Sequence, residues 1–420
     1  MNNTVFDAIV VGAGYAGLSA SYYLKQKELK HIVFERGSIG ESWLSQRWDS
    51  FKMNSANKLN VLPGINGQND PDAFCAASEC VSSFKEYVKT FHLPVLENTR
   101  VISIEKPSEY FDVTVSTNDT VKRYLSRQVI IASGIANEIK IPSFSKNISS
   151  DIIQLHSSEY RNPGQLPAGG ILVVGSAQSG CQIAEDLVDA GRKVFLSTSM
   201  VARIPRCYRG RDIMDWLIDM KFFEIPVEEI QDPKMLQMKP PQLTGIGDGK
   251  RTISLQSLAK KGIIILGKTD SADDENIFFQ PNAAMHVKFS DEFSKKVKEM
   301  IEGFISKNQL IVPEPQIDED DRIDENASCA SPVTSLNLNK DGIKSIIWAT
   351  GFQPDFSYIK LPVFKNDGTI KHKDGVSVIP GLYFTGLSWL HSRRSTLLFG
   401  IKEDTRFVIE KACDHALQTS

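Results

Sequence analysis

Two stretches of the chain repeat one hydrophobic pattern, in which a β-branched apolar run meets closely spaced glycines and then a helix-compatible segment. The first is AIVVGAGYAG at residues 8–17, and the second is ILVVGSAQSG at residues 171–180. Short, unbroken apolar runs bounded by turn residues are typical of strands that are buried on both faces. Each stretch therefore predicts a buried strand, a tight turn and a helix.

The glycine spacing of the first stretch fits a turn that grips a pyrophosphate. Gly12, Gly14 and Gly17 stand at G-x-G-x-x-G spacing, which allows the tight turn, the approach of backbone to the phosphates and the packing of helix on strand. The next apolar run, HIVFE, ends at Glu35. A carboxylate there accepts from an unphosphorylated adenosine ribose, such as that of FAD or NAD, and with the second stretch described below we predict an FAD site. Its expected contacts are Gly12, Gly14, Tyr15, Ala16, Gly17, Glu35 and Arg36.

The second stretch departs from this pattern in a way that favours a different nucleotide. Ala177 replaces the middle glycine, and the following run KVFLSTS ends without an acid. Arginines follow from Arg203 onward, and guanidinium groups suit a ribose 2′-phosphate. We therefore predict NADPH here; the alternative is a structural Rossmann repeat with a solvated arginine run. The expected contacts are Gly175, Ser176, Gln178, Ser179, Gly180, Ser197, Arg203 and Arg206.

Two similar strings, IIASG at residues 130–134 and IIWATGF at residues 346–352, predict strands that rejoin a parallel sheet close to a cofactor. They add Ser133, Gly134, Ala349, Thr350 and Gly351 to the expected cofactor contacts. The predicted fold class is α/β, with two Rossmann-like dinucleotide-binding domains of the three-layer FAD/NAD(P)-binding type. We expect an NADPH domain at residues 164–335, inserted into an FAD domain formed by residues 1–163 and 336–420.

A helical period marks the segment DEFSKKVKEMIEGFISK at residues 291–307. It places Phe293, Val297, Met300, Ile301 and Phe304 on one face, which predicts packing against the core. The acidic run at residues 318–325 predicts a solvated loop.

Charge and cysteine usage narrow the class of protein. The 420 residues carry a net charge of −3, so no basic excess indicates nucleic acid, and no apolar run is long enough to span a membrane. We expect a cytoplasmic protein without a metal site. Cys75 and Cys80 have the C-x4-C spacing of flavin disulfide reductases, but they lie in the pattern of an amphipathic helix, which favours ordinary helix cysteines.

The segment at residues 37–59 is rich in Trp, Arg and Asn and contains G-x-x-W at Gly40 and Trp43. Together with the two Rossmann units, HSSEY at residues 156–160 and the ATGF string, it resembles the flavin-containing monooxygenases and their Baeyer–Villiger relatives over nearly the whole chain. The sequence departs from the family at Met53, where a threonine is expected, and at Tyr160, where the Baeyer–Villiger variant has tryptophan.

The resemblance implies catalytic roles for Asn54 beside the flavin, with Asn57 in reserve, and for Trp43. It also implies flavin contacts from Trp43, Arg47, Gly386 and Leu387, and leaves His156 as either a domain-hinge or a satisfied structural histidine.

The implied activity is that of an NADPH-dependent FAD monooxygenase. It would form a C4a-hydroperoxyflavin from O2 and oxygenate a small organic substrate at nitrogen, sulfur or a carbonyl carbon. The alternative is an NADPH-dependent flavin reductase that passes electrons to a protein or small-molecule acceptor. Neither nucleic acid nor membrane is an expected partner, and a homodimer is one candidate for the oligomeric state.

Overall fold

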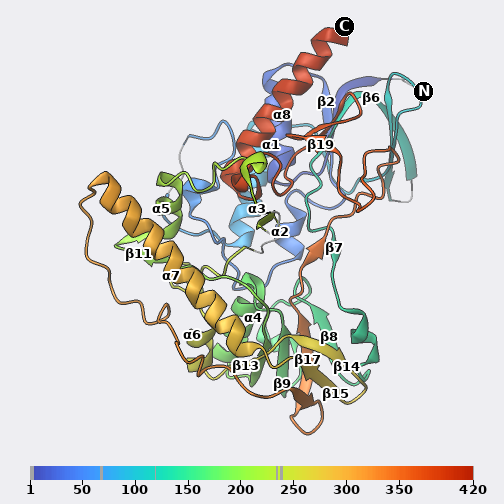
Figure 1. Cartoon of the computed structure of the whole chain (residues 1–420). Helices are drawn as coiled ribbons and strands as arrows, with labels where there is room; N and C mark the ends of the chain where they lie inside the picture. The colour runs from blue at the N-terminus through green and yellow to red at the C-terminus, as the bar shows by residue number, and fades with distance from the viewer. Residues whose placement is uncertain (1–3, 67–69, 119, 233–234, 237–239, 420) are drawn as a thin grey trace.

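The computed structural model describes residues 4–66, 70–118, 120–232, 235–236 and 240–419. The chain forms two halves, each built on a sheet with helices packed on it, and the halves meet around a central junction (Figure 1). This arrangement confirms the predicted α/β class with two Rossmann-like units.

The first sheet has its parallel centre at β6, β1, β2 and β3 and continues through β21 to an antiparallel edge. Its strands in spatial order are β19 (His372–Lys373), β20 (Val376–Ser377), β21 (Leu382–Phe384), β6 (Thr120–Ile131), β1 (Val5–Val11), β2 (His31–Phe34) and β3 (Val95–Leu96), with β4 (Arg100–Glu105) and β5 (Phe111–Thr117) branching from β6. The helices of this half are α1 (Tyr15–Gln26), α2 (Glu41–Ser45), α3 (Ala77–Thr90) and α8 (Leu398–Thr419). Helix α8 packs beside α1 at the top of Figure 1.

The second sheet is wholly parallel, and β9 and β10 at its centre are fully buried runs, as the sequence predicts. In spatial order they are β13 (Ile264–Leu266), β10 (Val194–Ser197), β9 (Gly170–Val174), β17 (Ile343–Trp348) and β8 (Ile153–His156). Its helices are α4 (Gln178–Asp189), α5 (Ile213–Asp219), α6 (Leu255–Lys260) and the long α7 (Ala283–Asn308). Smaller strands are β11 (Cys207–Tyr208) with β12 (Arg211–Asp212), and β14 (Thr269–Ala272) with β15 (Asn276–Phe279) and β16 (Ser335–Asn337).

The expected domain limits need a correction, because β8 and β17 both belong to the second sheet. Strand β17 pairs with β9, and β8 pairs with β17, although both lie outside residues 164–335. The chain crosses between the halves at β7 (Glu138–Ile139) and β18 (Phe352–Gln353), which pair with each other. We therefore propose that the inserted domain begins after β7 and ends before β18.

The two similar strings end beside the two glycine turns, and the same backbone contact recurs in both halves. Gly12 has a φ of +103°, and a Cβ there would lie 2.6 Å from the carbonyl oxygen of Ala132. Gly175 has a φ of +111°, and its Cβ would lie 2.4 Å from the carbonyl oxygen of Ala349. Only glycine allows this approach, so each turn is locked against the end of the neighbouring strand.

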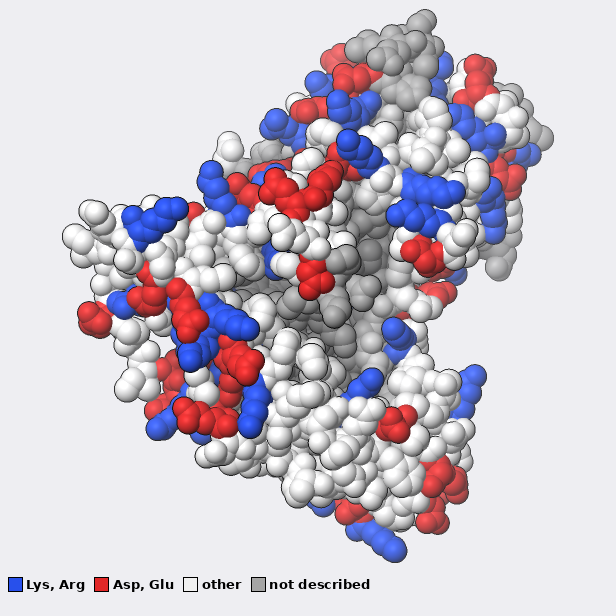
Figure 2. Space-filling model, viewed as in Figure 1, with Lys and Arg blue, Asp and Glu red and all other residues white. Residues whose placement is uncertain are grey.

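Helix α7 crosses the second half as a long diagonal (Figure 1), and two of the five residues of its predicted stripe are buried. Val297 and Ile301 are buried against α5, and Phe293 and Phe304 pack at the margin of the same cluster. Met300 is 39% exposed, so that part of the prediction was wrong. On the face drawn in Figure 2, acidic and basic side chains are interspersed.

Replacing Ile301 with alanine should lower the free energy of unfolding by about 2–5 kcal/mol, because the side chain is fully buried and leaves a cavity. The neighbouring change Met300→Ala is the matched control and should alter stability by no more than about 0.5 kcal/mol. Chemical denaturation of both variants measures the difference, and equal losses would contradict the packing described for α7.

Candidate active site

Both glycine turns open on one cavity of about 730 Å³. The first turn contributes Gly12 and Gly14, and the second contributes Gln178 and Ser179. The remaining walls come from residues 40–55, from 132–137 after β6, and from the segment that leads into α8. The cavity therefore joins the two halves at the carboxyl ends of their central strands, where open α/β sheets bind ligands.

The structure brings most of the expected residues to this cavity and leaves the others outside it. Those that line it are Gly12, Gly14, Tyr15, Ala16, Glu35, Arg36, Trp43, Arg47, Asn54, Ser133, Gly134, Gln178, Ser179 and Gly386. Those outside its lining are Gly17, Asn57, Gly175, Ser176, Gly180, Ser197, Arg203, Arg206, Ala349, Thr350, Gly351 and Leu387.

Glu35 is held as a fixed acceptor at one end of the cavity. Its carboxylate accepts from the backbone N–H of Ala13 at 2.7 Å and of Gly37 at 3.0 Å. Burial raises the pKa of this carboxyl, and the two N–H donors oppose that rise. A carboxylate held in this way at the tip of β2 suits the hydroxyls of an adenosine ribose.

The first turn leaves space where a pyrophosphate would lie. A Cβ on Gly14 would meet no atom within 4 Å, and Gly14 precedes α1 without a capping side chain. The first N–H groups of α1 thus face the cavity and can bind anionic oxygens. Gly17 has the separate task of packing, since its Cβ would lie 1.8 Å from the carbonyl oxygen of Gly12.

Arg47 supplies a positive charge to the middle of the cavity. Its guanidinium lies 5.0 Å from the ring centre of Trp43 and 5.3 Å from that of Phe51. Burial lowers the pKa of Arg47 to about 10, so the side chain is still cationic at neutral pH. A half-buried cation stacked on two aromatic rings suits a phosphate or an anionic flavin ring.

Asn54 presents an unused polar atom to the same space. Its Oδ1 is buried and has no hydrogen-bond partner among the described residues, and the residue lines the cavity. Buried polar atoms are almost always paired, so this one fits a bound group that donates to it. The Oδ1 of Asn57 is also buried without a partner among the described residues, but Asn57 lies off the cavity and its side-chain amide donates to the carbonyl of Asp70, so position on the cavity wall is what distinguishes Asn54.

In the second turn, Gln178 lines the cavity and also fixes the neighbouring loop. Its side chain accepts from the N–H of Leu243 at 2.8 Å and donates to the carbonyl of Thr244. Ser197 faces inward instead, where its hydroxyl donates to the carbonyl of Gly267 at 2.9 Å. Ser176 is fully buried and accepts from the N–H of Ser199 at 3.0 Å.

The placement of Arg203 argues against the 2′-phosphate role expected from the sequence. Its side chain is fully buried and donates to Asp291 of α7 at 2.7 Å and to Asp321. Buried Asp321 belongs to the acidic run that was expected to be a solvated loop, so this prediction was also wrong there. Arginine and acid neutralise each other inside the second half, because an unpaired buried charge would be costly.

Arg206 is likewise 1% exposed and bound within the protein. Its guanidinium donates to Asp212 and to the backbone carbonyl of Asn54, the latter at 2.7 Å. It also lies over the ring of Phe74. These contacts occupy the group that was expected to hold a 2′-phosphate.

His156 is a satisfied histidine at the junction of the halves. Its Nδ1 lies 2.8 Å from Ser158 Oγ and its Nε2 lies 3.0 Å from the carbonyl oxygen of Gly351. Thr350 donates to the carbonyl of Lys140 in the same region. Burial lowers the pKa of His156, which favours the neutral ring.

Sequence reasoning missed several lining residues. Gln182 stands four residues after Gln178 on the same face of α4, a spacing that could have revealed it. Tyr358, which hydrogen-bonds Ser133 through its hydroxyl at 2.8 Å, carries no comparable signal because it lies in an irregular segment.

Cys75 and Cys80 are both free thiols. Cys80 lies in the amphipathic helix α3, as the sequence predicts, but Cys75 precedes the helix, so the prediction was wrong for Cys75. Neither of them lines the cavity. No helix within the described part of the chain is long and apolar enough to cross a membrane.

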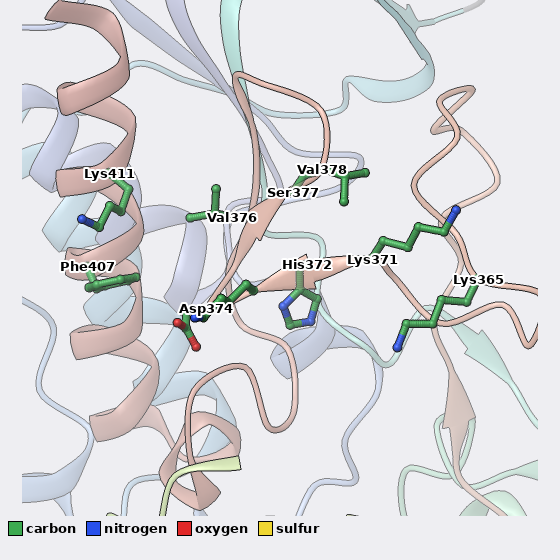
Figure 3. A pocket seen from close by; sticks show the side chains of 10 residues that line it. Lys365, Lys371, His372, Asp374, Val376, Ser377, Val378, Phe407 and Lys411 are labelled. Carbon is green, nitrogen blue, oxygen red and sulfur yellow. The ribbon is translucent and has the colours of Figure 1, made fainter. Parts of the chain in front are cut away.

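A second hollow, of about 640 Å³, shares no lining residue with the cavity. Figure 3 shows it between the β19–β20 hairpin and α8, with Lys365, Lys371 and His372 on one side and Phe407 and Lys411 on the other. It contains neither glycine turn, so it is not the site described above.

Two Rossmann-like halves that open on one cavity define an oxidoreductase of the two-nucleotide class. The family model described as pyridine nucleotide-disulphide oxidoreductase matches residues 9–204. The chain is 30% identical to an uncharacterized oxidoreductase, CzcO, of Bacillus subtilis, over 97% of this chain and 99% of that protein.

Solved structures agree in fold. A flavin monooxygenase mutant from Stenotrophomonas maltophilia superposes with a TM-score of 0.67 at 17% identity, covering 98% of this chain and 99% of that one. Ornithine N-hydroxylase of Kutzneria, solved with reduced FAD, NADP+ and ornithine, has a TM-score of 0.64 at 14% identity, covering 98% and 100%. The chain belongs to the same family of oxidoreductases as CzcO.

Gly14→Ala and Gly17→Ala separate the binding task of the first turn from its packing task. Gly14→Ala should fold but bind FAD at least about tenfold more weakly, about 1.4 kcal/mol, because its methyl group enters the space beside α1. Gly17→Ala should reduce the yield of folded protein, because its Cβ collides with Gly12. Flavin titration of each apoprotein with thermal unfolding tests this, and identical behaviour of the two variants would refute it.

Proposed function

We propose that the protein is an NADPH-dependent FAD monooxygenase that transfers one oxygen atom from O2 to a small organic molecule at nitrogen, sulfur or a carbonyl carbon. The observation that carries the proposal is the single cavity shared by both nucleotide turns, with the unpaired Oδ1 of Asn54 in its wall. The family supports the oxidoreductase class, and the cavity supports hydride transfer between two nucleotides held face to face.

When bound, FAD supplies the redox chemistry: it accepts hydride from NADPH and, once reduced, activates O2. The chain supplies position. Glu35 would bind the adenosine ribose, Gly14 and the N-terminus of α1 would receive the pyrophosphate, and Arg47 would supply positive charge to the flavin. Gln178 and Ser179, at the N-terminus of α4, receive the phosphates of NADPH.

Other lining residues would exclude water from the reacting centre. Buried Met53, the ring of Trp43 and the side chains of Leu397, Leu398 and Ile401 give the cavity an apolar wall around Asn54. In an apolar site that excludes water, activated oxygen held by a hydrogen bond would be transferred to the substrate before it is lost as peroxide. Asn54 is the residue that we expect to provide this bond.

A reductase is the competing function, and the name of the matching family model favours it. An enzyme that reduces disulfides through its own thiols would need a cysteine pair at the flavin. Among the described residues that line the cavity there is no cysteine. This composition argues against a thiol relay, whereas a reductase that passes electrons directly to a protein or small-molecule acceptor needs no cysteine and is distinguished by the following experiment.

Stopped-flow mixing of the reduced holoenzyme with O2 and NADP+ tests the proposal. We expect an absorbing transient before the oxidised flavin spectrum returns, and NADPH-dependent O2 consumption that a substrate accelerates. A panel of amines, sulfides, indole and ketones, assayed for oxygenated product and peroxide, identifies the substrate class. Rapid reduction of cytochrome c with no oxygenated product from any panel member would support the reductase instead.

Asn54→Ala should raise the peroxide released per NADPH oxidised by roughly fivefold, the loss that corresponds to one hydrogen bond of about 1 kcal/mol. Asn57→Ala is the matched control and should leave the ratio unchanged, because Asn57 lies off the cavity. Peroxide and NADPH are measured in the same assay. A larger effect at Asn57 than at Asn54 would reverse the assignment.

A further inference from the structure

The segment that carries Asn54 belongs to the first half by sequence but is tied to the second half by hydrogen bonds. At one end, Ser50 and Tyr160 both donate to Asp186 of α4, at 2.9 and 2.6 Å. At the other end, Arg206 donates from Nη1 to the main-chain carbonyl of Asn54 at 2.7 Å. The position of Asn54 in the cavity thus depends on the second half.

Arg206 is itself held rigidly. Its backbone N–H donates to Thr252 Oγ1 at 2.7 Å, and its Nη2 donates to Asp212, which in turn caps α5 by accepting from the N–H of Met214 at 2.8 Å. Because a guanidinium is a planar fork, fixing one arm on Asp212 fixes the direction of the other. That other arm is the one that binds Asn54.

A stacked ring completes the support. The guanidinium carbon of Arg206 lies 4.6 Å from the ring centre of Phe74, and a Cβ on Gly249 would lie 2.6 Å from the same ring. Phe74 is therefore confined between the guanidinium and the backbone at Gly249. Beside Phe74, the N–H of Met53 donates to the carbonyl of Cys75 at 2.9 Å. This bond joins the residue before Asn54 to the residue after Phe74.

We propose that Arg206 is a positioning residue, which sets the place of the Asn54 amide in the cavity by binding the Asn54 carbonyl from the second half. This inference rests on the proposed function and assigns Arg206 no contact with nucleotide or substrate. The arginine couples the orientation of the second half to the group expected to hold the activated oxygen. Loss of Arg206 should therefore release peroxide without changing how NADPH reduces the flavin.

The test compares Arg206→Met, Arg206→Lys and Arg211→Met as holoenzymes. Arg211 lies in the same stretch and pairs with Asp219 at 2.7 Å, so its variant controls for the loss of an arginine. We expect Arg206→Met to raise the peroxide released per NADPH by about threefold to fivefold. Flavin reduction rate and the preference for NADPH over NADH should stay within twofold of wild type. The peroxide released per NADPH by Arg206→Lys should lie between the values for wild type and Arg206→Met, because one ammonium group cannot replace both arms of the guanidinium.

The double variant Arg206→Met/Asn54→Ala shows whether the arginine acts through Asn54. We expect it to release no more peroxide than Asn54→Ala alone, since residues that act as one unit are not additive. The inference would be overturned if the peroxide released by the double variant were the sum of the increases in the two single variants. It would also be overturned if Arg206→Met released no more peroxide per NADPH than wild type, or if it selectively lost NADPH binding. If Arg206→Met does not fold, the inference is overturned when Arg206→Lys releases no more peroxide per NADPH than wild type. Failure of the proposed function is distinguished by the wild-type enzyme itself, which would then give no oxygenated product.

Discussion

The close approach of each glycine turn to the neighbouring strand is the constraint on which the rest of the structure depends. At Gly12 the backbone of the turn lies against Ala132, and at Gly175 it lies against Ala349. These contacts aim the first residues of α1 and α4 at the space beyond the sheet edges. Because both halves repeat the contact, both turns reach the same cavity.

The cavity is completed by residues whose position is set across the junction of the halves. Arg161 donates to the backbone carbonyls of Ser45 and Arg47, and Asp186 binds Ser50. Most of these bonds end on backbone carbonyls or on a short side chain, so they fix the course of the segment rather than the identity of its side chains. Contacts from the second half thus set the course of the segment, and its side chains line the cavity.

Local patterns predicted the fold well because the signals were local. The strand–turn–helix order, the acid at Glu35 and the amphipathic α3 each depend on residues that are close in sequence, and the structure agrees with all three. The domain limits failed because pairing of β17 with β9 joins segments far apart in the chain. The sequence of residues 343–348 alone does not indicate which of the two sheets this strand joins.

The candidate site shows the same division. The cavity contains the glycines, Glu35 and Asn54, which motif spacing or resemblance had indicated. Arg203 was misjudged because its partners, Asp291 and Asp321, lie far along the chain. An arginine run and an acidic run each look solvent-exposed when taken singly. Only their meeting inside the second half shows that they are a buried ion-pair network, which sequence position alone does not reveal.

The chain enters and leaves the second half through adjacent strands, with Lys140 donating from its N–H to the carbonyl of Gly351 at 3.0 Å beside the β7–β18 pair. The two crossings are therefore held together as one two-stranded connection. Since both ends of the insert leave from one point, the insert can be gained, lost or exchanged between proteins as a unit while the host sheet stays intact.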